Sequence, residues 1–157
     1  MTIKQAQMST KITQIIILYA SILGSCVGCQ KLSSLDVPEE VRSAFAKGYP
    51  NAKFSTWDKE TFEGHVVYEA EGVIVGKISR NVMYSPEGNV VQVEDTMPVA
   101  DLPALITSAV SKQYPQAVIK SAEKRTHAEM VEYALKLRGA TVKMVVVDRD
   151  GKIISTK

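Results

Sequence analysis

Cysteine is scarce in this chain of 157 residues, which holds only Cys26 and Cys29. Both lie near the start of the sequence, so no disulfide can staple the part that follows. Net charge is also small, because the formal value is +2 and residues 1–25 contribute Lys4 and Lys11 without any acid. The rest of the chain is therefore neutral overall. Phosphate binding needs a clustered basic surface, so the composition disfavours nucleic acid as a partner.

Residues suited to catalysis or metal binding are few. The two histidines, His65 and His127, do not align with each other in the internal repeat of the chain, and no G-x-S-x-G nucleophile motif is present. The C-x-x-C spacing of Cys26 and Cys29 lies outside any βαβ unit, which a thioredoxin-like site requires, and a zinc site would need two more ligands. We therefore expect no enzyme activity, no cofactor and no metal.

A long hydrophobic run is missing as well. The most apolar stretch, residues 15–23, is shorter than the roughly 20 residues that a membrane-spanning helix needs. It follows two lysines and precedes small residues, which is typical of a signal peptide over residues 1–25. Met8 is an alternative start, since a complete charged region follows it.

The end of this leader resembles the bacterial lipobox, with the sequence Leu23-Gly24-Ser25-Cys26. The resemblance implies a lipidated Cys26 followed by a tether over residues 26–35, and two or more acyl chains anchor a protein stably. It also implies an exported periplasmic or cell-surface lipoprotein, with the outer membrane as the expected location. The role of Cys29 stays open.

What the sequence does contain is an internal repeat at a constant offset of 65 residues, which aligns residues 37–52 with residues 102–117. Such self-similarity indicates a duplicated structural unit. In each copy, apolar residues at helical spacing predict a helix that ends at a Tyr-Pro step and is capped by Asp36 or Asp101. The residues identical in the two copies are Pro38 and Pro103, Ala44 and Ala109, Lys47 and Lys112, Tyr49 and Tyr114, Pro50 and Pro115, and Ala52 and Ala117.

Four β-rich stretches follow each helix. They cover residues 53–60, 65–71, 73–84 and 89–94 in the first copy, and residues 118–126, 129–138, 140–147 and 152–156 in the second. Their alternation of apolar and polar residues predicts an antiparallel sheet with one buried and one wetter face. The first copy is longer, and the extra residues around Ser79–Asn81 predict a bulge or a longer hairpin.

The sequence thus predicts an α+β fold of two tandem α-β-β-β-β repeats, residues 36–97 and residues 98–157. The helices are expected to pack on one face of an antiparallel sheet that could run continuously through eight strands. Residues 36–96 carry 6 basic and 11 acidic residues, whereas residues 101–157 carry 10 basic and 6 acidic ones. This asymmetry fits either attraction between packed halves or a dipolar surface that steers a partner.

The segment Val37-Pro38-Glu39-Glu40-Val41, continued by Tyr49-Pro50-Asn51-Ala52-Lys53 and Trp57, resembles the PepSY-like family of exported bacterial proteins, also called β-lactamase-inhibitor-like. The resemblance covers residues 36–156 and implies tandem helix-plus-sheet units in an exported, often lipid-anchored protein. It also implies kinship of fold with inhibitors that bind enzymes through the open face of the sheet. The chain lacks their disulfides, and its second copy has Ala122 where the first has Trp57.

The wetter sheet face is the candidate binding surface, because it mixes apolar and charged side chains as transient interfaces do. Its carboxylates are expected to be exposed, with ordinary pKa values. Trp57 either joins this face as an aromatic anchor or packs in the core. The candidate partner-binding residues are Trp57, His65, Val67, Glu69, Met130, Glu132 and Lys136.

The sequence therefore predicts a non-catalytic, lipid-anchored binding module of the cell envelope, of an inhibitor-like or regulatory kind. It would engage an envelope protein or peptide through the open sheet face. The alternative is an envelope protein that binds a small ligand or senses stress through a pocket between the two repeats.

Overall fold

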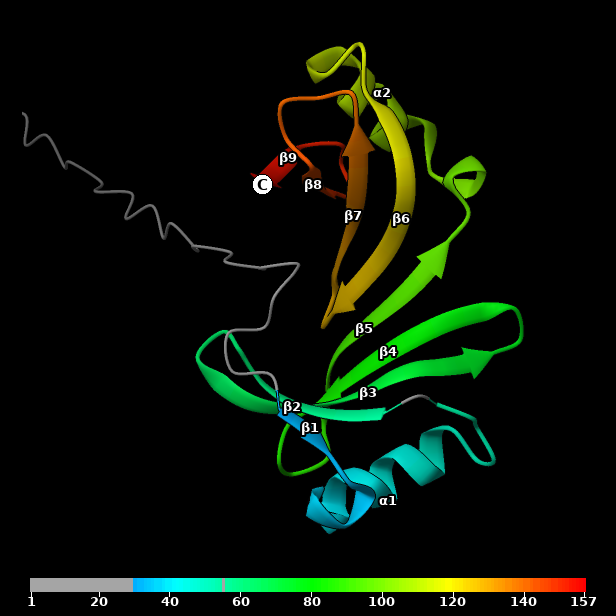
Figure 1. The fold of residues 1–157 in the computed structure, drawn as a ribbon, viewed down its shortest axis with the longest axis vertical. Helices are drawn as coiled ribbons and strands as arrows, with labels where there is room; N and C mark the ends of the chain where they lie inside the picture. Colours follow the sequence, from blue (N-terminus) through cyan, green and yellow to red (C-terminus); the bar gives the residue numbers. More distant parts are fainter. Residues whose placement is uncertain (1–29, 55) are drawn as a thin grey trace, which may run out of the picture.

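The computed structural model of the protein describes residues 30–157 except residue 55. The predicted signal peptide, Cys26 and Cys29 lie outside this part of the chain. The described residues form one antiparallel sheet of nine strands, in which each strand pairs with its neighbours in the sequence (Figure 1). The strands are β1 (Gln30–Leu32), β2 (Thr56–Phe62), β3 (His65–Val75), β4 (Ile78–Tyr84), β5 (Val90–Met97), β6 (Val118–His127), β7 (Met130–Arg138), β8 (Met144–Asp148) and β9 (Ile153–Thr156).

The expected α+β class, with a layer of helices on one face of the sheet, is wrong. The protein is largely β, because the only α-helices in the described part are two of 10 residues each, α1 (Glu39–Gly48) and α2 (Ala104–Gln113). The sheet twists strongly, so the two helices lie at opposite ends of the molecule and form no continuous layer (Figure 1). None of the helices in residues 30–157 is long and apolar enough to cross a membrane.

Each helix covers a separate hydrophobic core in its own half of the sheet. Val41 and Phe45 of α1 pack on a cluster that includes Trp57 and Tyr84. The second core is aliphatic and contains α2 residues with strand residues of β7 and β8. The buried members of that core are Leu102, Ile106, Val110, Ala122, Tyr133, Leu135, Leu137, Val145 and Val147.

The Tyr-Pro-x-Ala signature of the repeat forms the same turn twice. The backbone N–H of Ala52 donates to the Tyr49 carbonyl at 3.1 Å, and that of Ala117 donates to the Tyr114 carbonyl at 2.9 Å. Both tyrosines pack against the core of their own half. The two helices end at the residue before this tyrosine, as the sequence predicts.

The predicted amino-terminal caps are wrong. Asp36 and Asp101 lie in short 3-10 turns, η1 (Ser34–Asp36) and η2 (Val99–Asp101), that precede the helices. The residue before each proline is extended, with φ −86° and ψ 136° at Val37, because a proline disfavours helical angles in the residue before it. Each helix therefore begins after the proline, and the Asp36 carboxylate accepts a hydrogen bond from the Ser33 hydroxyl instead, at 2.6 Å.

The first half departs from the predicted strand boundaries in two places. Gly72 does not end a strand but lies in a bulge of β3, where its φ is +64° and its N–H donates to Asn81 Oδ1 at 3.0 Å. The strand then continues to Val75, and β3 and β4 form the longer, bulged hairpin that the extra residues of the first copy predict. Residues 30–32, expected in a tether, form β1 and pair with β2.

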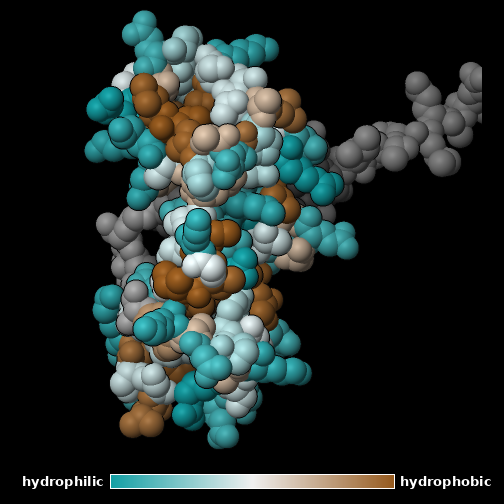
Figure 2. All heavy atoms as spheres, turned by 90° about the vertical axis from the view of Figure 1, so that its right-hand side faces the viewer, coloured by the Kyte–Doolittle hydropathy of each residue, from teal (hydrophilic) through white to brown (hydrophobic). Residues whose placement is uncertain are grey.

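Hydrophobic surface is spread thinly over the side of the molecule shown in Figure 2. It forms separate patches (brown) among hydrophilic residues. Exposed apolar side chains in the protein include Leu35, Ile74, Val90 and Leu105. Scattered apolar residues of this kind are normal for a protein surface and do not by themselves mark a site.

Candidate functional site

The side of the sheet that faces away from the two helices, here called the open face, follows from the register of the strands. Because side chains alternate along a strand, Trp57 in the α1 core places its neighbour Asp58 on the open face. Asp58 pairs with Glu69, Glu69 with Met83, and Met83 with Gln92. The open face comprises Asp58, Glu60, Phe62, His65, Val67, Glu69, Glu71, Met83, Gln92, Glu94, Glu123, Arg125, His127, Met130, Glu132, Ala134, Lys136 and Val146.

The open face is concave. Phe62 of β2 and His127 of β6 are separated by three strands, which in a flat sheet would put them about 19 Å apart at about 4.8 Å per strand. Their rings nevertheless meet edge to face, with centroids 5.4 Å apart. The sheet must therefore curl until the β2–β3 hairpin of the first repeat touches the β6–β7 hairpin of the second.

Six of the seven predicted partner-binding residues share the open face, and Trp57 does not. Trp57 is 3% exposed and packs edge to face on Phe45, with ring centroids 5.3 Å apart, so it belongs to the core. The six that the register brings to one surface are His65, Val67, Glu69, Met130, Glu132 and Lys136.

Glu69 occupies the middle of the first repeat's open face and is far from an ordinary surface acid. Its side chain is 7% exposed, and burial raises its pKa to about 8. The nearby carboxylates of Glu60, Glu94, Glu71 and Asp58 contribute to this rise in pKa. The expectation of exposed carboxylates with ordinary pKa values is therefore wrong for Glu69, because the curl of the sheet withdraws the centre of this face from water.

Arg125 of β6 is the buried cation of the open face, and its side chain is 2% exposed. Its guanidinium lies 3.1 Å from Glu94, 3.5 Å from Glu123 and 3.9 Å from Glu132. Burial raises the pKa of Glu94 and of Glu132, and the charge of Arg125 opposes that rise in both. Since Glu94 lies on β5 and the other two acids on β6 and β7, Arg125 ties the first repeat to the second.

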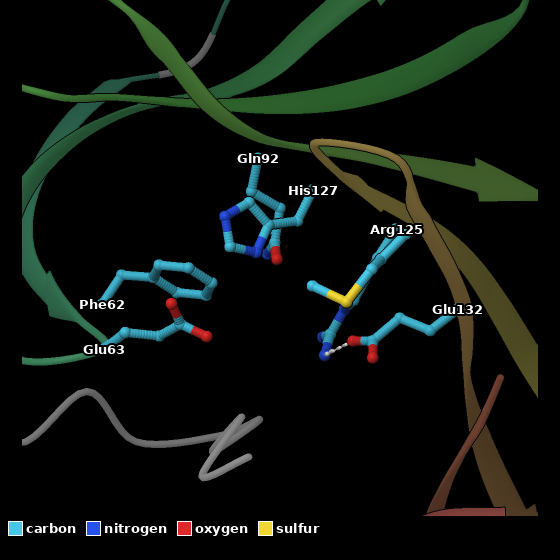
Figure 3. A pocket seen from close by; sticks show the side chains of 7 residues that line it. Phe62, Glu63, Gln92, Arg125, His127 and Glu132 are labelled. Carbon is cyan, nitrogen blue, oxygen red and sulfur yellow. Dashed lines mark ion pairs between the residues drawn. The ribbon is translucent and has the colours of Figure 1, made fainter. Parts of the chain in front are cut away.

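A shallow hollow opens beside Arg125, where the two repeats meet (Figure 3). Its volume is about 270 Å³, including the space open to solvent. Phe62 and Glu63 form one side, and Arg125 with Glu132 forms the other (Figure 3). The full lining is Phe62, Glu63, Gln92, Arg125, His127, Met130 and Glu132.

Sequence reasoning missed the residues that give this face its charge, among them Asp58, Glu94 and Arg125. The alternation that placed Glu69 and Glu132 on one face also places these three there, once the register across β5 and β6 is known. That register depends on how β5 of the first repeat pairs with β6 of the second. Aligning one copy of the repeat with the other gives no information about this pairing. Among the described residues, no three His, Cys, Asp or Glu side chains are grouped so that they could hold a metal ion.

No protein-family profile and no curated protein matches the chain. Solved structures do share its fold. A DUF2874 family protein from Bacteroides uniformis is 17% identical with a TM-score of 0.62, over 76% of this chain and 88% of the other. Another from Bacteroides ovatus is 17% identical with a TM-score of 0.60, over 76% and 86%. A BLIP-like protein from Bacteroides fragilis is 19% identical with a TM-score of 0.56, over 76% and 85%. At such identities the likeness shows the fold alone, so the chain has a BLIP-like fold.

Proposed function

We propose that this protein is a non-catalytic binding module of the bacterial cell envelope that engages a protein or peptide through its open face. The observation that carries the proposal is the curl of the sheet, which makes a helix-free concave surface with the buried carboxyl group of Glu69 and the buried guanidinium of Arg125 near its centre. Groups that become paired only in a complex are common in recognition surfaces, because buried charges gain most from a complementary partner.

The PepSY-like resemblance and the solved neighbours support the cellular side of the proposal. One neighbour, from Bacteroides eggerthii, is provisionally described as periplasmic; it is 15% identical with a TM-score of 0.59. A BLIP-like neighbour suggests an inhibitor-like or regulatory role. The lipobox-like Leu23-Gly24-Ser25-Cys26 suggests a signal peptide and a lipid anchor.

An anchor at Cys26 would hold the open face near the membrane. Gln30 begins β1 and pairs with Lys59, close to the β2–β3 hairpin that forms one side of the hollow. Four Cα steps separate Cys26 from Gln30, and at about 3.8 Å each they span at most about 15 Å. The protein would therefore sit on the membrane surface, with its partner arriving beside the bilayer.

A photo-crosslinking amino acid tests the binding surface in cells. We expect Met130, which is on the open face and 44% exposed, to yield a specific protein adduct after irradiation. Leu105 on α2, 54% exposed and away from the open face, is the matched control. The same adducts from both positions, or none from Met130, would contradict the proposal.

The anchor has a separate test. Cys26→Ser removes the thiol that lipidation requires, so the protein should move from the membrane fraction to the soluble fraction, whereas Cys29→Ser should leave it in place. Continued membrane association of the Cys26→Ser variant would refute the assignment.

A second candidate function is binding of a small ligand in the hollow between the repeats. The hollow is lined from both repeats and carries a guanidinium and an imidazole beside an aromatic ring. A ligand that fills it should raise the melting temperature of the wild type more than that of Arg125→Met.

A further inference from the structure

The open face of the first repeat is acidic and carries no lysine or arginine of its own. The strands β2, β3 and β5 contribute five carboxylates to it, and the remaining described side chains that β2 to β5 place on that surface are neutral or histidine. The five are Asp58, Glu60, Glu69, Glu71 and Glu94.

Two cations approach this acidic surface at its borders. Arg125 lies 3.1 Å from Glu94, but it also forms ion pairs with Glu123 and Glu132 of the second repeat. At the opposite border, Lys31 of β1 lies 4.0 Å from Glu71, and its side chain is 75% exposed, so the pair is weak. Lys31 also faces Asp58 across β1 and β2, but among the described residues neither Asp58 nor Glu69 forms an ion pair.

Among the described residues, Asp58 also lacks a hydrogen-bond donor for one of its carboxylate oxygens. Its side chain is 1% exposed, and its Oδ1 accepts no hydrogen bond within the described part of the chain. Asp58 also shares a side-chain hydrogen bond with Glu71, a contact that raises the pKa of Glu71. A buried carboxylate oxygen without a donor is costly, so Asp58 would gain from a donor that a partner supplies.

We infer that this acidic surface binds a basic, extended segment of a partner protein, whose lysine or arginine side chains supply the missing donors. The inference rests on the proposed function and adds the chemistry of the partner. Asp58 and Glu60 are two residues apart on β2, as Glu69 and Glu71 are on β3. An extended peptide with a basic residue at every second position repeats at the same spacing, about 7 Å.

A fluorescent peptide of about eight residues that alternates arginine and serine is a direct probe, with a peptide that alternates glutamate and serine as its counterpart. Binding to the full chain is followed by anisotropy at low salt, where charge contacts are least screened. We expect the basic peptide to bind, the acidic one not to bind, and the affinity to fall as salt rises.

The decisive variant is Glu60→Gln with Glu69→Gln, compared at about pH 9, where Glu69 is charged, so that it removes two charges from the acidic surface and keeps the side-chain shapes. Its matched control is Glu39→Gln with Glu87→Gln, which removes two charges from exposed positions of the same repeat. We expect the first variant to bind the basic peptide about tenfold more weakly and the control to stay within about twofold of the wild type. Equal loss in both variants would show attraction to net charge alone and would overturn the inference.

The pH dependence adds a readout that unfolding would not produce. Glu69 has a pKa of about 8 in the free protein, so raising the pH through that range charges it and should tighten binding of the basic peptide. The other charged and titratable groups of the surface around it are Lys31 from β1, Asp58 and Glu60 from β2, His65 and Glu71 from β3, Glu94 from β5 and Arg125 from β6, while Met83 of β4 is neutral. The increase should vanish in the Glu60→Gln, Glu69→Gln variant and persist in the control.

Two further outcomes would overturn the inference. One is that calcium or spermine binds the wild type and the basic peptide does not, since the surface would then select small cations. The other is that the Met130 photo-adduct forms equally in the Glu60→Gln, Glu69→Gln variant, in which case the open face binds its partner without the acidic surface. In that second case the proposed function stands and the inference fails.

Discussion

The two repeats share a fold but fill it differently. In the first, the core under the helix is aromatic, and the rings of Phe45, Phe54 and Trp57 contact one another at centroid distances of 4.9 to 5.5 Å. In the second, Ala122 stands at the position of Trp57, and the core is mostly aliphatic. The open faces differ as well, because the first repeat collects acids and the second contributes Arg125 and Lys136.

This difference separates what the fold needs from what the protein does. The shared positions, such as Tyr49 and Tyr114, support the same turn in each half. The divergent positions lie under α1 and on the open face. We therefore attribute folding to what the repeats have in common and recognition to the surface on which they differ.

The largest effect is expected at the aromatic core. Trp57→Ala removes a side chain that is 3% exposed and leaves a cavity beneath α1, so it should lower the free energy of unfolding by about 3–5 kcal/mol. Because Trp57 is the only tryptophan, unfolding is best followed by circular dichroism. Ala122→Gly at the matching position of the second repeat should cost about 1 kcal/mol. Equal losses at the two sites would remove the distinction between the cores.

The acidic surface should make stability depend on pH. The ordinary pKa of Glu69 is 4.5, and its pKa in the folded protein is about 8. Between these pH values the folded protein keeps a proton on Glu69 that the unfolded chain releases. This contribution to stability is present at low pH and is lost as the pH rises from about 4.5 to 8, with an effect on the order of 4–5 kcal/mol.

Glu69→Gln cannot titrate, so urea denaturation should show a flatter pH profile and a more stable protein at about pH 9 than the wild type. The exposed Glu87→Gln is the control and should keep the wild-type profile. A wild type whose stability is level across this range would contradict the prediction.

Arg125 should matter more than any other cation of the open face. Arg125→Met leaves Glu94, Glu123 and Glu132 facing one another without a counter-charge, so stability should fall by about 2 kcal/mol. Lys136→Met, an exposed residue of the same face, should change it by less than about 0.5 kcal/mol. Similar thermal unfolding of both variants would show that Arg125 does not join the repeats.

The smallest effects distinguish two equivalent turns. Gly88 and Gly151 both have φ near +83° and both approach the helix of their own repeat. A Cβ at Gly88 would lie 2.6 Å from the backbone oxygen of Glu40, whereas one at Gly151 would lie 2.8 Å from the Leu105 side chain. Since a side chain yields more readily than backbone, Gly88→Ala should cost about 2 kcal/mol and Gly151→Ala about 1 kcal/mol. Thermal melts that rank them in reverse would contradict this account.

The repeat in the sequence made much of the architecture predictable. The two helices end where their Tyr-Pro steps predict, and eight of the strands lie within or close to the predicted stretches. Asp36 was misjudged because the proline two residues on keeps the chain extended. The fold class was predicted wrongly because the alternation of apolar and polar residues shows which side chains face the helices. It does not show how far the sheet twists between α1 and α2.

The candidate site was harder to predict, because its properties arise from curvature. Six residues of the wetter face could be named, but the burial of Glu69 depends on the approach of the β2–β3 and β6–β7 hairpins, which are far apart in the sequence. The sequence also left open whether Trp57 lies in the core or on the open face. Strand alternation shows only that Trp57 and its neighbours in β2 point to opposite sides of the sheet.

The strand order also bears on how the protein acquires its structure. Each strand pairs with the strand before it and the strand after it, so a chain that emerges gradually can add them one at a time without waiting for a distant segment. The entropy lost in closing each loop is small, which favours rapid folding. The edge strand β9 has 4 residues, and so short an edge gives neighbouring chains little to pair with.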